Sequence, residues 1–214
     1  MMEGNKPMTL PDNLLQLQQE ALAAVRTNPE GMLPLSWRMR MWAALGPMQR
    51  EGTRATRSVG HRRRTVLALL CAKHVLAIWE NEWPQLAWPH EAMQAAEDYL
   101  SDKIDFETAR TIARRCYTNL ENFSPPKSKY YTIYAAFAAV GSLNVALHDE
   151  EFDPEEIDEN LSDRDLDDWD PAFYAACAYA GSFPWGDSPD PSKPQEFWEW
   201  YLQMAIPQAW DSVE

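Results

Sequence analysis

The chain has 214 residues, 45% of them hydrophobic, and carries a formal net charge of −14 at pH 7. Ten tryptophans and this hydrophobic content exclude a disordered acidic chain, and the length suits one domain. No stretch approaches the roughly 18 to 20 apolar residues of a membrane span, and residues 1–12 lack the apolar run of a signal peptide. We therefore expect a cytoplasmic protein in which residues 1–214 form a single α-helical domain.

Two helices are predicted before residue 50. Asp12 is expected to cap a helix that runs to about Arg26, because apolar residues recur there at helical spacing. Ser36 is expected to cap a short second helix, which the Gly46-Pro47 pair ends.

A central helix is predicted from Arg64 to about Glu82, where apolar residues lie on nearly every side of the helical wheel. Pro89 begins another helix that reaches Leu100. Asp105 caps the next one, whose apolar residues make one face.

The second half contains a short internal repeat, because the segment Tyr134–Ser142 recurs as Tyr174–Ser182 with six of nine positions identical. We interpret this as two Ala-rich helices that pack closely; a helical-repeat scaffold is the alternative. A last helix spans about 194–205, and Pro207 breaks or kinks it. With no convincing period-two pattern for a strand, the fold class is all-α, a helical-bundle-like domain with Ala-rich packed helices and an acidic connecting segment.

The three cysteines are far apart and lie in apolar or Ala-rich helical sequence: Cys71, Cys116 and Cys177. We expect buried free thiols, as in a reducing compartment. Close-spaced metal ligands such as Cys-x-x-Cys do not occur in the sequence, so no metal or cofactor is predicted.

The most unusual feature is the acidic segment, residues 149–170, in which thirteen of twenty-two residues are acidic and Arg164 is the only base. It could be a solubilising loop or a docking surface for a basic partner. Calcium is disfavoured, because Asp168 replaces the turn glycine of an EF-hand loop begun at Asp163, and Tyr174 its bidentate glutamate. The candidate partner-binding residues are Glu150, Glu151, Asp153, Glu155, Glu156, Asp158, Glu159, Asp163, Asp165, Asp167 and Asp168.

A cluster of arginines precedes the central helix and continues into it: Arg38, Arg40, Arg50, Arg54, Arg57, Arg62, Arg63 and Arg64. In so acidic a chain we expect this arginine cluster to pair with the acidic segment. Nucleic-acid binding is not predicted, since affinity for phosphates needs uncompensated positive charge.

No catalytic motif stands out, although some residues carry alternatives. His74 is interpreted as a core histidine. The pair His148-Asp149 is similar to the metal-binding pair of HD-type phosphohydrolases, so a helical metal-dependent hydrolase stays an alternative, but the nearest upstream histidine is His90. Three tryptophans predicted in loops either pack over turns or anchor an interface: Trp83, Trp88 and Trp185.

Two stretches carry a resemblance to a known family. The stretch Leu67–Leu100, continued by Phe106–Cys116, and the Trp-rich ending FWEWYLQMAIPQAW resemble an all-helical family of immunity proteins from bacterial polymorphic-toxin loci. The resemblance implies that the protein neutralises a cognate toxin by binding it. It implies no catalytic residue.

Overall fold

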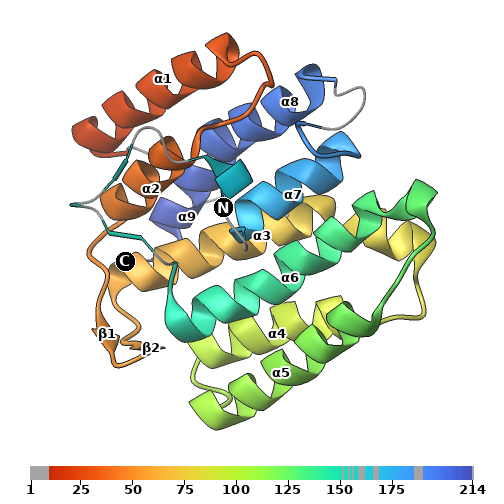
Figure 1. Cartoon of the computed structure of the whole chain (residues 1–214). Coiled ribbons are helices and arrows are strands. Elements are labelled where there is room, and N and C mark those ends of the chain that lie inside the picture. Colours follow the sequence, from red (N-terminus) through yellow and green to blue (C-terminus); the bar gives the residue numbers. More distant parts are fainter. Residues whose placement is uncertain are drawn as a thin grey trace, which may run out of the picture.

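The computed structural model describes residues 10–150, 152–153, 155, 157–158, 162–165, 169–185 and 190–213, with the side chain of residue 165 excepted. In this part of the chain the regular structure is nearly all helical, which confirms the all-α class (Figure 1). The elements in chain order are α1 (Asp12–Thr27), α2 (Leu35–Ala44), β1 (Arg50–Glu51), β2 (Arg54–Ala55), α3 (Val59–Glu82), α4 (Trp88–Leu100), α5 (Phe106–Asn122), the 3₁₀ helix η1 (Lys127–Lys129), α6 (Tyr131–His148), the 3₁₀ helix η2 (Asp163–Asp165), α7 (Pro171–Ala180), α8 (Ser192–Trp200), the π-helical turn η3 (Tyr201–Ala205) and α9 (Ile206–Asp211).

Helix α3 is the central element, as predicted, and it packs against α4, α6, α7 and α9. Leu67, Cys71 and Trp79 are among its buried residues. The helix begins earlier than the apolar pattern indicates, because the Ser58 hydroxyl caps it by accepting a hydrogen bond from the His61 amide at 3.2 Å.

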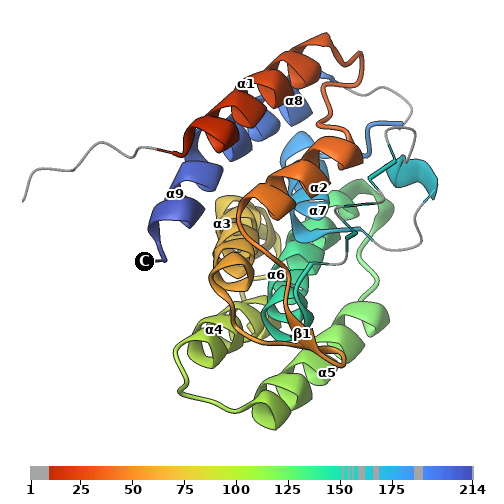
Figure 2. The same cartoon turned by 90° about the vertical axis from the view of Figure 1, so that its left-hand side faces the viewer.

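The remaining helices lie in layers on either side of α3 and α6. Figure 2 shows α1 beside α8 at one end of the molecule and α4 with α5 at the other. None of the helices in the described residues is long and apolar enough to cross a membrane.

The first repeated segment lies in α6, and the second lies in α7 and the two residues that follow it. The two helices pack against each other as predicted. Alanines give both helices small buried faces, so the backbones can approach closely. A Cβ added to Gly141 of α6 would lie 3.0 Å from Cγ of Pro171 in α7, which shows how close the approach is.

The two caps predicted before residue 50, Asp12 and Ser36, are wrong. Asp105 caps α5 as expected, because its side chain accepts a hydrogen bond from the Thr108 amide at 2.8 Å. Pro11 occupies the N-cap position of α1, and Asp12 lies in the first turn, where a negative charge still favours the helix dipole. Ser36 is buried inside α2, which starts after Pro34.

The C-terminal helix and the region after α2 also differ from expectation. The chain stays helical past Pro207, which lies in the first turn of α9 directly after the π-helical turn η3. A small antiparallel hairpin, in which Arg50 is opposite Ala55, was not predicted. Strands of two residues are too short to show a period-two pattern.

Candidate functional site

The N-terminal end of the acidic segment is held by Arg64, which projects from α3. Its Nε and Nη2 atoms donate to the two carboxylate oxygens of Asp149 at 2.6 and 2.7 Å, and both side chains are fully buried. Its Nη1 atom donates to the backbone carbonyls of Trp42 and Gly46 at 2.8 and 2.7 Å. Asp149 has a φ of +68°, unusual for a non-glycine residue, and the bidentate pair fixes the chain where it leaves α6 in that conformation.

The far end of the segment is held by Arg38, a fully buried residue of α2. The guanidinium donates to Asp163 through both Nη atoms, and Nη2 lies 3.0 Å from a carboxylate oxygen of Asp170. The rings of Phe173 and Trp198 each lie 5.4 Å from its central carbon. Burial opposes the charged form of Arg38, but Asp170 and Asp163 together outweigh it and raise its pKa.

These two contacts confirm, for Arg38 and Arg64, that the arginine cluster pairs with the acidic segment. Other arginines of the cluster contact groups elsewhere: Arg54 bonds the Tyr99 hydroxyl, Arg57 pairs with Asp102, and Arg63 lies over the Trp210 ring. A buried ion pair with several hydrogen bonds fixes geometry more than it adds stability. The anchors therefore define where the acidic segment leaves and rejoins the helical core.

Apolar and aromatic contacts hold the segment as well. Phe152 is buried, with its ring 5.8 Å from Trp42 and 5.4 Å from the Arg64 guanidinium carbon. Arg164 forms a 2.6 Å ion pair with Glu30 and lies over the ring of Trp185. The sequence signal for this inward packing is the presence of aromatic residues within an otherwise acidic run.

The candidate partner-binding residues fall into three groups. Glu150 and Asp163 are each only 9% exposed, so they lie within the anchored base of the segment. Asp153, Glu155 and Asp158 are exposed at the surface. The other candidates lie outside the described residues, Asp165 by its side chain alone: Glu151, Glu156, Glu159, Asp165, Asp167 and Asp168.

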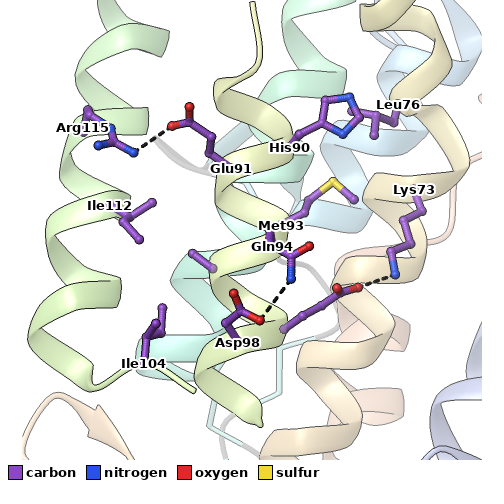
Figure 3. Close-up of a pocket in the computed structure, with 12 residues that line it drawn as sticks. Lys73, Leu76, His90, Glu91, Met93, Gln94, Asp98, Ile104, Ile112 and Arg115 are labelled. Carbon is purple, nitrogen blue, oxygen red and sulfur yellow. Dashed lines mark hydrogen bonds and ion pairs between the residues drawn. The ribbon is translucent and has the colours of Figure 1, made fainter. Parts of the chain in front are cut away.

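Figure 3 shows a groove of about 690 Å³ lined by α3, α4 and α5. Its polar side chains bond to one another: Arg115 to Glu91 at 2.8 Å, and Lys73 to Glu97 at 2.6 Å. Pairs of this kind are typical of exposed contacts between neighbouring helices. Nothing in this arrangement directs a set of polar groups at a ligand.

A second groove, of about 1020 Å³, lies beside the acidic segment. Its lining comes from α2, α5, α6, the start of α7 and both ends of the segment, and includes Trp42, Arg114, Phe137, His148, Glu150, Trp169, Asp170 and Tyr174. Carboxyl groups and aromatic rings therefore line the same groove. We call it the Glu150 groove.

The prediction for His74 is wrong. This residue lies on the exposed side of α3, where its ring stacks on Trp200 with centroids 3.7 Å apart and on Tyr179 at 5.5 Å. These aromatic neighbours come from the C-terminal half, distant in sequence, and flank the ring without burying it. The fully buried histidine is His61, whose Nε2 lies 3.0 Å from the carbonyl oxygen of Val145.

His148 and the three cysteines were considered for metal binding or redox chemistry, and the structure shows what each of them contacts or how it is buried. His148 has its Nδ1 atom 2.7 Å from the backbone carbonyl of Thr53. In the described part of the chain, no three His, Cys, Asp or Glu side chains cluster in a way that could hold a metal ion. All three cysteines are free and buried, as predicted.

The tryptophans predicted in loops pack within the molecule. Trp83 donates from Nε1 to the Thr132 hydroxyl at 3.0 Å, and Trp88 is buried at the start of α4. Trp185 stacks on Phe183 with centroids 5.3 Å apart. Packing, rather than an exposed anchor, accounts for these rings.

Residues 19–208 match the family model of immunity protein Imm5. The chain belongs to the Imm5 immunity protein family. The resemblance predicted from the sequence is thereby confirmed. No curated protein matches the sequence.

The region matched to the immunity protein family includes Arg38, Arg64 and the whole acidic segment. The segment therefore lies within the matched range. Membership in an immunity family implies a toxin partner in general terms.

Proposed function

We propose that the protein binds a cognate bacterial toxin in the cytoplasm and neutralises it by stoichiometric inhibition, without catalysis of its own. The observation that carries the proposal is an acidic segment within the matched immunity domain, held by buried Arg38 and Arg64 and exposing Asp153, Glu155 and Asp158. The exposed acids form the docking surface for a basic patch of the toxin. The candidates outside the described residues belong to the same proposal: Glu151, Glu156, Glu159, Asp165, Asp167 and Asp168.

Electrostatics supports this arrangement. A net charge of −14 attracts a basic partner over distance, and complementary fields raise association rates by roughly 10- to 1000-fold. An inhibitor that must capture its toxin early benefits from a fast encounter. Anchoring the segment at both ends lowers the ordering cost of binding, because part of the segment is already held in place.

The proposal also covers the domain organisation of the chain and its lack of a nucleic-acid partner. We treat residues 1–214 as one domain, supported by the packing of α3 against helices from both halves. We propose no nucleic-acid partner, since Arg38 and Arg64 are buried in ion pairs and the net charge is strongly negative.

The test uses the cognate toxin, which is to be sought among the products of neighbouring genes. Purified toxin is titrated with the chain, and residual toxin activity is measured together with the mass of the complex. Inhibition should reach completion at a fixed ratio, with an isolable complex. Full neutralisation by a small fraction of one equivalent would instead favour the metal-dependent enzyme, and metal analysis of the same sample would identify its ion.

A further inference from the structure

The Glu150 groove combines a buried acid with aromatic walls. Phe137 and Tyr174 stack with ring centroids 4.7 Å apart, and Trp169 meets Tyr174 edge-on at 5.6 Å. Glu150 lines the same groove although it is only 9% exposed. Aromatic faces beside a carboxyl group are the surroundings in which proteins hold organic cations.

The Glu150 carboxyl group lines the groove without a hydrogen-bond donor from the described part of the protein. Among the described residues, none donates a hydrogen bond to it; the backbone amide of Glu150 donates to Asp149, and Arg50 bonds only the Glu150 carbonyl oxygen, at 2.9 Å. A buried carboxyl group without a partner is costly. The cost disappears if a ligand supplies a donor.

The charges around Glu150 do not balance. Asp149 and Asp170 are its acidic neighbours, and each is already paired with a guanidinium, Arg64 and Arg38 respectively. Asp163 shares the same Arg38. Burial, with repulsion from Asp170 and Asp149, raises the pKa of Glu150 well above its ordinary range despite both arginines. Among the buried side chains of this cluster, four carboxyl groups therefore face two guanidiniums, while the exposed Arg50 contacts only the Glu150 carbonyl oxygen, which leaves room for one more positive charge.

We propose that the Glu150 groove is a binding site for an arginine side chain of the partner protein, whose guanidinium pairs with the Glu150 carboxylate and stacks on the aromatic walls. This inference rests on the proposed function and adds the residue class that the partner inserts. A guanidinium fits better than an ammonium, because the planar guanidinium can donate two hydrogen bonds to a carboxylate while its flat face stacks on an aromatic ring.

The basic residues of the groove do not occupy this place. Arg110 pairs with Glu107 at 2.8 Å and lies near the Phe106 ring, so its charge is directed elsewhere on α5. Arg114 is exposed on α5, and the Nδ1 atom of His148 contacts the Thr53 carbonyl oxygen. These groups line the α5–α6 side of the groove, and the acids lie at the acidic segment.

The probe is N-acetyl-arginine methylamide, which carries a guanidinium and no other charge, titrated into the full chain by calorimetry. The matched probe is the citrulline analogue, a neutral compound of the same shape. The arginine probe should bind at least tenfold more tightly than the citrulline probe, and Glu150→Gln should remove that difference. Glu155→Gln, an exposed acid of the same segment, should leave it intact. Equal binding of both probes, no binding of either, or unchanged selectivity in Glu150→Gln would each overturn the proposal.

Measuring proton release on binding distinguishes direct pairing of the probe with Glu150 from an indirect structural effect of the Glu150→Gln substitution. Pairing with a guanidinium favours the ionised carboxylate, so affinity for the probe should rise as pH passes through the raised pKa of Glu150, and binding in that pH range should release protons. Titrations in buffers of different ionisation enthalpy measure the proton release. His148 lines the same groove, so a pH dependence that persists in Glu150→Gln contradicts the assignment to Glu150. Glu150→Met serves as a second uncharged variant if Glu150→Gln unfolds.

The toxin itself distinguishes this inference from the proposed function. If Glu150→Gln neutralises the toxin with unchanged affinity, the groove proposal fails and the function stands. If the unaltered chain does not bind the toxin, the function fails, and the probe titration still reports on the groove.

Discussion

Replacing Arg38 by methionine should strongly destabilise the fold. Methionine keeps much of the side-chain volume but leaves Asp163 and Asp170 buried without their cation. Breaking a buried ion pair from one side costs about 3–5 kcal/mol. For a chain of this length that corresponds to a fall in the melting temperature on the order of 10 °C.

The loss should depend on pH, with a sign that follows from the raised pKa of Asp170. Burial raises that pKa, Asp163 adds to it, and Arg38 opposes both. Removing Arg38 therefore raises it further. An acid whose pKa is raised in the folded state destabilises the fold above its unfolded pKa, so the penalty of Arg38→Met should grow as pH rises from about 4 to 7.

Urea unfolding followed by tryptophan fluorescence at pH 4.5 and pH 7 measures both effects. Asp170→Asn added to Arg38→Met should recover part of the loss at pH 7, and asparagine still caps α7. Arg26→Met, which breaks an exposed pair with Glu199, is the matched control and should change little. If Arg38→Met were no more destabilising than Arg26→Met, the anchor would not exist as described.

Two further predictions concern close packing and the thiols. Gly60→Ala should lower stability by roughly 1–3 kcal/mol, because the new Cβ would lie 2.6 Å from the backbone of Gly46, whereas Gly141→Ala meets only the ring of Pro171 at 3.0 Å and should cost less. Chemical denaturation of both variants checks the order, and the reverse order would contradict the backbone contact. The cysteines should react slowly with a disulfide reagent in native protein and quickly in urea, since burial raises the pKa of Cys116 to about 11 and shields all three thiols. Rapid native labelling would contradict the buried placement.

Much of the fold could be predicted, because it follows from local patterns. The apolar residues of the central helix, the cap at Asp105 and the Ala-rich repeat each depend on residues close in sequence. The predictions for Asp12 and Ser36 failed because both follow a proline, Pro11 and the nearby Pro34, that already starts the helix.

The candidate site could be predicted only in outline. The runs of opposite charge predicted that arginines pair with the acidic segment. They could not show which arginine pairs with which acid, because Arg38 and Asp163 are 125 residues apart and meet only through the tertiary packing of α2 against the segment. Local sequence also could not show that Glu150 turns inward while Glu155 faces solvent. The neighbouring Phe152 was the one available signal.

The most direct test of the account is the association rate with the cognate toxin when the exposed acids are neutralised. The variant carries Asp153→Asn, Glu155→Gln and Asp158→Asn, and its control carries Asp12→Asn, Glu20→Gln and Glu121→Gln, which remove the same charge from α1 and α5. Stopped-flow measurements at low and physiological salt should show the first variant associating on the order of tenfold more slowly at low salt, with a flatter salt dependence and unchanged helix content. The control should stay close to the unaltered chain. Equal rates for all three proteins would contradict docking through the acidic segment and return it to the role of a solubilising loop.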